Sequence, residues 1–461
     1  MEKNKFKLEF QVKDKDELEK LTHEELLKYV KELTDSLVPE KPKKDSNNSS
    51  IAPSQDINKP KPNKSLREIS GKSSGGQKGH IGSTLKQSDT PDIIIEMGKD
   101  RKECLKCGSS LSNVLAKLKE KRQILDINLE DLNTKITEYQ SYSKNCPICG
   151  YENIEEFPNN IAPHISYGVN IQSLVTYLNI VHYLPYNRIV EVLSSLYKID
   201  ISEGSISNML KRMNELSEKE ILKIQENLEL SRVVGIDETG CKIDGEKHWN
   251  WVFQDRKNTL IVINKSRGAK VISETFPNGF NENVCIVHDN YSSYSSLNVD
   301  REQLCLAHKL RDLNYAIECE DNETMKSIKF ILKEAIKDDK EDLVYNQRLI
   351  LREFYKVMLE SLLKEKIPED DIESLRQIKS FAKAKDKIFE FLTHSDIPAD
   401  NNGSERAIRN IKVKLKVSGQ FKSFKGAENY ANLRSIIDTS KKRNMNPLEV
   451  LSKISNNMVI F

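Results

Sequence analysis

Apolar residues recur at helical spacing over residues 165–230, which predicts three consecutive helices. Ile171, Val175 and Leu178 share one face of the first helix, the second follows Pro185, and Ser202 is placed to cap the third. The short 198–201 turn predicts a helix-turn-helix in 161–230, although a plain helical bundle has a similar pattern. In the first interpretation the third helix offers these side chains to a DNA groove: Ser205, Ser207, Asn208, Lys211 and Arg212.

Short apolar runs replace the helical spacing after residue 231. Three adjacent strands are predicted by apolar runs at 233–236, 249–253 and 259–263. A helical stretch follows, and an apolar run at 284–287 predicts a further strand. That order predicts an α/β sheet of the ribonuclease H kind. We assign this core to 231–312 and 396–445, with a helical insertion at 313–395 and a C-terminal segment at 446–461.

The first 75 residues differ from both patterns. Thr22 and Glu25 fit a capping box, and Leu26, Val30, Leu33 and Leu37 follow on one helical seam. We therefore expect a helix in 1–38, either a short coiled coil or a small helix packed on its own domain. Residues 39–75 are rich in Pro, Lys, Ser and Asn with little to bury, so we expect a disordered basic linker.

Four of the eight cysteines form two CxxC pairs in residues 76–160. Cys104 and Cys107 precede Gly108, Cys146 and Cys149 precede Gly150, and 38 residues separate the pairs. Two cysteine turns on either side of a predicted hairpin are typical of a structural four-thiolate Zn²⁺ site, with a longer excursion than most ribbons have. A redox role for one pair is the alternative, and two matched pairs argue against it.

Composition and charge limit the class of function. The 461-residue chain has no window near the ~18 apolar residues that a membrane span needs and no apolar signal segment after Met1, so we expect a cytoplasmic protein. Its 72 Lys and Arg nearly balance 70 Asp and Glu. Yet residues 403–445 hold 11 basic against 3 acidic residues, and 39–80 hold 9 against 4. These stretches indicate either contact with an anionic polymer or two solvated faces.

Three acids are candidates for phosphoryl-transfer chemistry. Asp237 and Asp289 come directly after apolar runs, and Gly403 and Ser404 place Glu405 in the first turn of a helix by breaking and capping it. Two strand-end aspartates and a helical glutamate can converge on two Mg²⁺ ions for in-line phosphoryl transfer. Aspartate at a strand end is also a common turn former, so spacing alone leaves both interpretations open.

Blocks along nearly the whole chain resemble those of the bacterial insertion-sequence-66 family of transposases. The resemblance covers the linker, the cysteine pairs, the central helices, the acids and the basic tail. Its most specific blocks are Gly75-Gly-Gln-Lys-Gly-His80, Tyr183-Leu-Pro-Tyr-Asn-Arg188, Val234-Gly-Ile-Asp237-Glu-Thr-Gly240, Val287-His-Asp289, Cys305-Leu-Ala-His308-Lys-Leu-Arg311, Asp400-Asn-Asn-Gly-Ser-Glu405-Arg406 and Gly426-Ala-Glu-Asn-Tyr-Ala-Asn-Leu-Arg434. Asn290-Tyr291 after Asp289 departs from the family pattern in the loop and leaves the ligand in place.

The resemblance implies a DDE transposase with Asp237, Asp289 and Glu405 as ligands of catalytic Mg²⁺ or Mn²⁺. It also implies binding to terminal inverted repeats and, in many members, small accessory proteins; bringing two ends together implies at least a dimer. We expect His308 and Arg311 to face the metal site or the scissile phosphate, with packing and helix charge as the alternative. Basic residues after Glu405 would follow the DNA backbone, unless Lys412–Lys416 form a solvated strand edge: Arg406, Arg409, Lys412, Lys414, Lys416 and Lys422.

Two rival functions share these residues. A catalytically silent DNA-binding regulator derived from a transposase would keep the DNA-binding modules, and the intact acids argue against it. A nuclease on the same fold would cut DNA without joining it, and product analysis separates the two.

Overall fold

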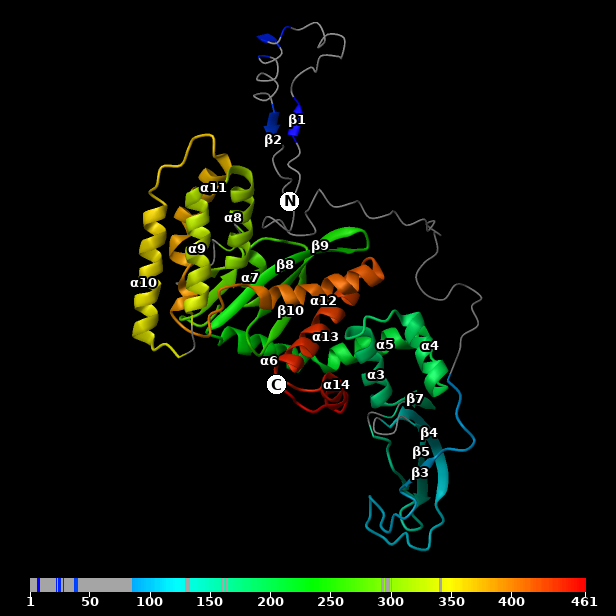
Figure 1. The fold of residues 1–461 in the computed structure, drawn as a ribbon. Helices are drawn as coiled ribbons and strands as arrows, with labels where there is room; N and C mark the ends of the chain where they lie inside the picture. Colours follow the sequence, from blue (N-terminus) through cyan, green and yellow to red (C-terminus); the bar gives the residue numbers. More distant parts are fainter. Residues whose placement is uncertain are drawn as a thin grey trace. The chain divides into compact units, whose positions relative to one another are not determined.

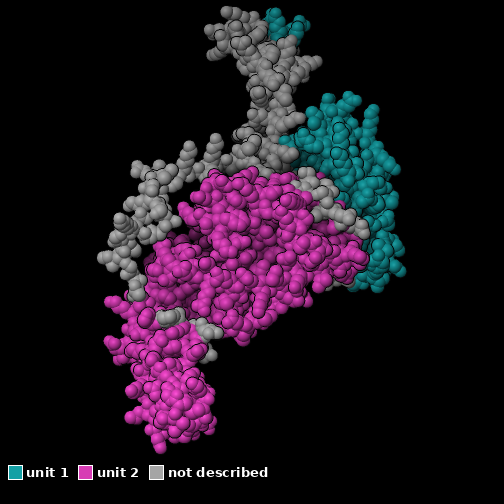
Figure 2. Space-filling model, turned by 180° about the vertical axis from the view of Figure 1, so that it is seen from behind, with its two compact units in different colours: residues 1–64, 303–399 teal, residues 65–302, 400–461 magenta. Residues whose placement is uncertain are grey.

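The computed structural model describes residues 6–8, 22, 24–25, 28, 37–39, 85–128, 133–158, 161, 164–291, 294, 299, 301–339 and 342–461. The chain divides into two compact units, coloured separately in Figure 2. Unit 1 comprises 1–64 and 303–399, and unit 2 comprises 65–302 and 400–461. Among the described residues, none of the helices combines the length and apolarity needed to cross a bilayer.

Unit 2 begins with a sheet built around a long hairpin. Strands β4 (Lys117–Ile127) and β5 (Thr134–Asn145) pair antiparallel, with an irregularity between Leu118 and Glu120. Strands β3 (Ile93–Met97) and β6 (Glu152–Ile154) pair with β5, and β7 (Ile165–Tyr167) pairs with β4. The hairpin predicted between the cysteine pairs is therefore confirmed, and it connects the two cysteine turns.

Four helices follow: α3 (Val169–Ile180), α4 (Tyr186–Tyr197), α5 (Glu203–Leu216) and α6 (Glu218–Glu229). As predicted, Ser202 caps α5, because its hydroxyl accepts a 3.1 Å hydrogen bond from the Ser205 amide. Lys198 ends α4 in a left-handed conformation with φ 56°, which turns the chain toward α5. The C-terminal helix α14 (Pro447–Ser455) packs on this module, where Ser455 and Ser173 hydroxyls lie 3.1 Å apart.

The second sheet has the order β10-β9-β8-β11-β12. Strands β8 (Val233–Ile243), β9 (Glu246–Gln254) and β10 (Thr259–Asn264) are antiparallel neighbours. After α7 (Lys270–Thr275), β11 (Cys285–His288) returns parallel to β8, and β12 (Arg301–Leu304) follows. The predicted order of three adjacent strands, a helix and a further strand is confirmed, and the structure adds the strand directions, antiparallel for the first three and parallel for β11.

Two helices lie across one face of this sheet (Figure 1). They are α12 (Asn402–Ser418) and α13 (Phe424–Lys442). Helix α13 also protects the β10 edge, because the Thr259 and Ile261 amides donate to the Thr439 and Ser435 hydroxyls at 3.0 and 2.8 Å. Satisfying the amides of an edge strand removes a site of unwanted strand pairing.

The segment predicted as a helical insertion, 313–395, lies within a longer helical stretch of unit 1. This stretch contains α8 (Leu306–Glu320), α9 (Glu323–Asp338), α10 (Tyr345–Leu362), α11 (Ile372–Ala384) and the 3₁₀ turns η2 (Lys385–Lys387) and η3 (Glu390–Leu392). Met325, Ile328 and Leu332 of α9 are fully buried, as their helical spacing predicts. Strand β12 ends at Leu304, and α8 begins two residues later at Leu306.

The N-terminal prediction is confirmed in one part and wrong in another. The Glu25 amide donates to the Thr22 hydroxyl and the Thr22 amide donates to the Glu25 carboxylate, which completes the capping box. Leu37, however, lies in β2 (Leu37–Pro39), paired with β1 (Phe6–Leu8), and not on a helical seam. The rest of that seam and the 39–75 linker, apart from Pro39, lie outside the described residues.

Candidate functional site

Asp237 lies inside a strand and not at its end as predicted. It is the fifth residue of β8 and pairs with Val252 of β9. Asp289, in contrast, does follow directly after β11, and its carboxylate accepts a 3.1 Å hydrogen bond from the Tyr291 amide. Because β11 runs parallel beside β8, the end of β11 brings Asp289 to the neighbouring strand.

Helix α12 places Glu405 on the same side of β8. Asn401 is the N-cap residue, so Glu405 lies in the first helical turn as predicted, while Gly403 and Ser404 are helical and do not break or cap the chain. The buried Asn401 side chain donates to the Ile236 carbonyl at 2.8 Å and accepts from the Ser404 hydroxyl at 2.7 Å. These bonds tie the start of α12 to the residue before Asp237.

Gln254 explains the glycine in this helical turn. A Cβ added to Gly403 would lie 2.6 Å from the Gln254 amide nitrogen, and one added to Gly235 would lie 2.4 Å from the same atom. The Gln254 side chain therefore lies between α12 and β8, and a Cβ at either glycine would displace its amide end.

The three carboxylates interact electrostatically. Burial raises the pKa of Asp237 well above its usual value, and the nearby charges of Asp289, Glu238 and Glu405 raise it further. Such mutual repulsion among oxygen ligands is relieved by a divalent cation. The donor set, carboxylate oxygens from two strands and a helix, fits Mg²⁺ or Mn²⁺, and Asp237, Asp289 and Glu405 are the residues that would hold it.

A second cluster supports the segment after β11 from the opposite face of β8. Glu238 follows Asp237, so its side chain points to the other face of the strand. It accepts from the Tyr294 hydroxyl and forms a 2.7 Å ion pair with Arg267, whose guanidinium lies 3.7 Å from the Tyr291 ring centre. Glu238 was not among the residues predicted for the site, and its only signal in the sequence is its position directly after Asp237.

The basic residues after Glu405 divide into exposed and partly buried groups. The alternative of a solvated strand edge at Lys412–Lys416 is wrong, because these residues lie on α12. Arg406, Arg409, Lys416 and Lys422 are exposed, whereas Lys412 and Lys414 are partly buried. Burial lowers the pKa of both lysines; the Asp237 charge acts in the opposite direction on Lys412, and the Lys414 ammonium lies 5.6 Å from the Tyr430 ring centre.

The remaining predicted residues lie on helices. On α5, Ser207, Lys211 and Arg212 are exposed and Ser205 is partly exposed, so this face is accessible. His308 and Arg311 lie on α8 as expected, in unit 1, whereas the three acids belong to unit 2.

The four paired cysteines converge at the base of the hairpin. The sulfur of Cys104 lies 3.7 Å from that of Cys149, and the sulfur of Cys107 lies 3.6 Å from that of Cys146. A tetrahedral Zn²⁺ with bonds of about 2.3 Å requires sulfurs about 3.8 Å apart, so the cluster fits this ion.

Local contacts keep the two cysteine turns alike. Gly108 and Gly150 adopt φ values of 71° and 70°, and their amides donate to the Cys104 and Cys146 carbonyls at 2.9 and 3.0 Å. The Ser109 hydroxyl and then the Cys149 amide lower the pKa of the Cys146 thiol to about 6, which favours the thiolate. The Asn153 amide lies 3.6 Å from the Cys104 sulfur.

Comparison with known proteins adds a family match. A family model described as "Transposase IS66 family" matches residues 164–429, a range that contains all three acids. No curated protein matches the chain.

Solved structures match parts of the chain. The HTLV-2 integrase catalytic core in complex with magnesium is 15% identical, with coverage of 30% of this chain and 92% of that chain and a TM-score of 0.14. The catalytic domain of Mos1 mariner transposase is 14% identical, with coverage of 41% and 93% and a TM-score of 0.14. These TM-scores are low, so we assign the fold from the strand order of the second sheet, β10-β9-β8-β11-β12.

Proposed function

Because the chain belongs to the IS66 family of transposases, we propose that it cleaves DNA at the terminal inverted repeats of its element and joins the freed 3′ ends to target DNA. The observation that supports this proposal is the raised pKa of buried Asp237: burial raises it most, and the charges of Asp289, Glu238 and Glu405 raise it further, as expected for acids that lie near one another. Repulsion among three neighbouring acids opposes folding, so their placement favours a role in binding a cation.

The proposed reaction uses one site twice. Bound Mg²⁺ supplies activation of the attacking oxygen and stabilisation of the leaving one, with water as the nucleophile in cleavage and a 3′-hydroxyl in joining. The chain's own contribution is to hold its three carboxylates in place. Asn401 and Gln254 position the helix that carries Glu405 against β8. Glu238 contacts the segment after Asp289 through the Tyr294 hydroxyl.

DNA binding in this proposal uses two surfaces of unit 2. Arg406 and Arg409 are exposed one and four residues after Glu405, so a phosphate backbone bound to them would pass the acids. The exposed face of α5 would contact the terminal repeat, as the second helix of a helix-turn-helix does. Zn²⁺ held by the four cysteines would stabilise the hairpin sheet. Pairing two ends requires at least a dimer, with small accessory proteins as further partners.

The experiment that tests the proposal uses the full chain, zinc-loaded, with labelled duplexes from the DNA that flanks its gene. Mg²⁺- or Mn²⁺-dependent nicking with joined products, absent in Glu405→Gln, supports the transposase. Nicking without joined products identifies a nuclease. Specific binding without cleavage, also after addition of accessory proteins encoded beside the gene, identifies a silent regulator.

A further inference from the structure

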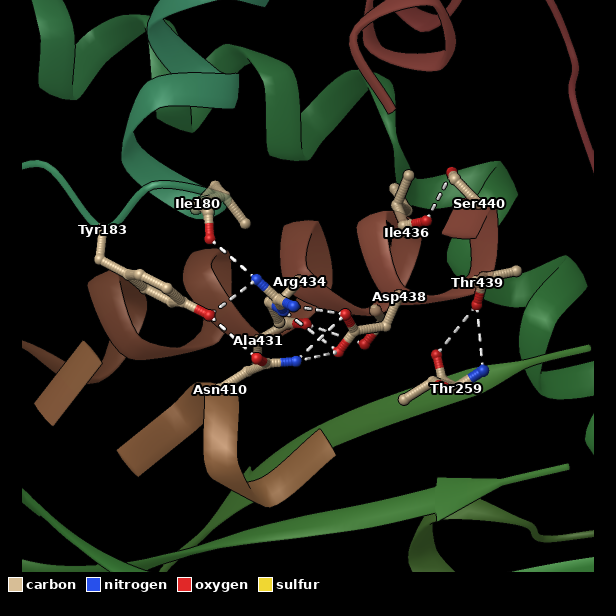
Figure 3. Close-up of polar contacts among 11 residues, drawn as sticks. Ile180, Tyr183, Thr259, Asn410, Ala431, Arg434, Ile436, Asp438, Thr439 and Ser440 are labelled. Carbon is tan, nitrogen blue, oxygen red and sulfur yellow. Dashed lines mark hydrogen bonds and ion pairs between the residues drawn. The ribbon is translucent and has the colours of Figure 1, made fainter. Parts of the chain in front are cut away.

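Arg434 is a buried cation in the middle of α13, with only 2% of its surface exposed. Its guanidinium forms a two-pronged ion pair with Asp438 one turn later, at 2.5 and 3.1 Å (Figure 3). This geometry satisfies only part of the guanidinium, which has five N–H donors. The remaining donors connect α13 to other parts of unit 2.

The first connection is to the end of α3. A terminal nitrogen of Arg434 donates to the Ile180 carbonyl at 3.1 Å and to the Tyr183 hydroxyl at 3.3 Å. Ile180 is the last residue of α3, where carbonyl groups lack partners within the helix and the helix dipole favours a cation. Arg434 therefore binds the predicted DNA-recognition module to the core.

The second connection is to α12. The Tyr183 hydroxyl donates to the Asn410 side-chain oxygen at 3.0 Å, and the Asn410 amide lies 3.4 Å from both Asp438 oxygens. Figure 3 shows Tyr183, Asn410, Arg434 and Asp438 pointing toward one another from three different segments. Tyr183 has φ 60°, which is uncommon for an aromatic residue and costs backbone strain. The strained backbone directs this hydroxyl to α12.

Asn410 lies five residues after Glu405 on the same helix. The start of α12 is held by Asn401, and its buried residues Ala407 and Ile411 pack in the core. A hydrogen-bonded attachment beyond Glu405 further restricts rotation about the helix axis. The rotation of α12 decides whether the Glu405 carboxylate faces Asp237 and Asp289.

We propose that Tyr183 and Asn410 are positioning residues that orient α12 so that Glu405 completes the divalent-cation site. The inference rests on the proposed function, because it takes Glu405 to be a metal ligand. It makes the segment after α3 part of the support of the active site, so that the helices proposed to read DNA and the helix that carries Glu405 share one hydrogen-bond network.

The test compares two tyrosines that each lose one hydroxyl. Tyr183→Phe removes the bond to Asn410 and the one accepted from Arg434, whereas the control Tyr167→Phe removes a 2.7 Å bond to the carbonyl of Asp200, a residue between α4 and α5. Mn²⁺ binding to the zinc-loaded full chain is measured by electron paramagnetic resonance, and unfolding by calorimetry. Asp237→Asn identifies which Mn²⁺ site belongs to the acids.

We expect Tyr183→Phe to weaken Mn²⁺ binding at that site about fivefold, the factor that corresponds to one lost hydrogen bond, while Tyr167→Phe binds as the wild type does. The unfolding temperature should fall further for Tyr183→Phe than for Tyr167→Phe, because Tyr183→Phe also loses the bond from buried Arg434. A purely structural role for Tyr183 predicts equal Mn²⁺ affinity in both variants, and that result overturns the inference while leaving the proposed function intact.

A double-mutant cycle gives a second readout. If Tyr183 acts through Asn410, Tyr183→Phe and Asn410→Ala together weaken Mn²⁺ binding by less than the product of the two single effects. Multiplicative effects contradict the proposed link. A wild-type protein with no Mn²⁺ site that Asp237→Asn removes overturns the proposed function and this inference together.

Discussion

The Asn401 side chain donates a 2.8 Å hydrogen bond to the carbonyl of Ile236, the residue that precedes Asp237. This bond joins two segments that are 165 residues apart in the sequence. It connects the N-cap of the helix that carries Glu405 to the strand that carries Asp237. The relative placement of two proposed ligands thus depends on one buried amide and on the close packing beside it.

That packing predicts opposite effects of alanine at two glycines in the same helical position. Gly403 and Gly204 are both the second residue of a helix. A Cβ at Gly403 meets Gln254 at 2.6 Å, so Gly403→Ala should destabilise the protein by about 1–3 kcal/mol. A Cβ at Gly204 finds only the Ser202 hydroxyl at 3.6 Å, so Gly204→Ala should stabilise by about 0.4–1 kcal/mol. Urea unfolding of both variants measures the difference, and equal midpoints would contradict it.

Asp237→Asn should abolish cleavage yet raise the thermal stability of the protein in chelator near neutral pH. Burial and neighbouring acids raise the pKa of Asp237 in the folded state. Folding therefore favours the protonated acid, and the metal-free protein loses stability as pH rises from the unfolded pKa through the higher folded one. Asparagine removes this loss.

Calorimetry in chelator at several pH values measures this effect, with Asp244→Asn as a control at a surface turn. Added Mg²⁺ should then raise the unfolding temperature of the wild type and leave that of Asp237→Asn unchanged. A lower unfolding temperature for metal-free Asp237→Asn at neutral pH would show that repulsion among the acids is not relieved by the substitution.

Cys146→Ser should lose bound zinc and increase hydrogen exchange across residues 100–158. In the wild type the Cys146 sulfur lies 3.6 Å from that of Cys107 within the four-sulfur cluster. The variant keeps three thiolates, which hold Zn²⁺ less tightly than four. Cys319→Ser, on α8 of unit 1, is the matched control and should keep its zinc. Metal analysis decides the prediction, which fails if Cys146→Ser retains the wild-type zinc content.

Arg406→Ala with Arg409→Ala should flatten the salt dependence of DNA binding. Both side chains are exposed on α12, and loss of two phosphate contacts reduces the slope of log affinity against log salt by about 1.8. Lys329→Ala with Lys333→Ala on α9 is the control. Lys414→Ala should leave the slope unchanged, because Lys414 is partly buried beside Tyr430. Fluorescence anisotropy at several salt concentrations measures all three slopes, and an unchanged slope for the arginine pair would place those residues away from DNA.

Local pattern was enough to predict most elements and to single out the candidate residues for metal binding. The spacing of apolar residues predicts α3, α4 and α5 and the strands of the second sheet, because side-chain periodicity follows from the local backbone geometry. The CxxC spacing predicts a four-cysteine cluster, because each pair needs only its own turn to bring two sulfurs together. Asp237 and Asp289 are likewise visible as acids next to apolar runs, and Glu405 as an acid in the first turn of a predicted helix.

What local pattern could not decide depends on packing between distant segments. In the sequence the apolar run stops at Asp237, but pairing with β9 continues the strand through Ile243. The alternation at Lys412–Lys416 resembles a strand, yet the contacts of α12 with the sheet make it helical and partly bury Lys414.

Most elements, the cysteine turns and the candidate ligands could be predicted from the sequence. The orientation of Glu405 could not, because it depends on contacts between α12 and distant residues. These are Ile236, Gln254 and Tyr183, each more than 140 residues away along the chain. The spacing of apolar residues shows only which face of its own helix or strand a residue lies on. The rotation of a helix against a sheet depends instead on side chains that become neighbours only after folding.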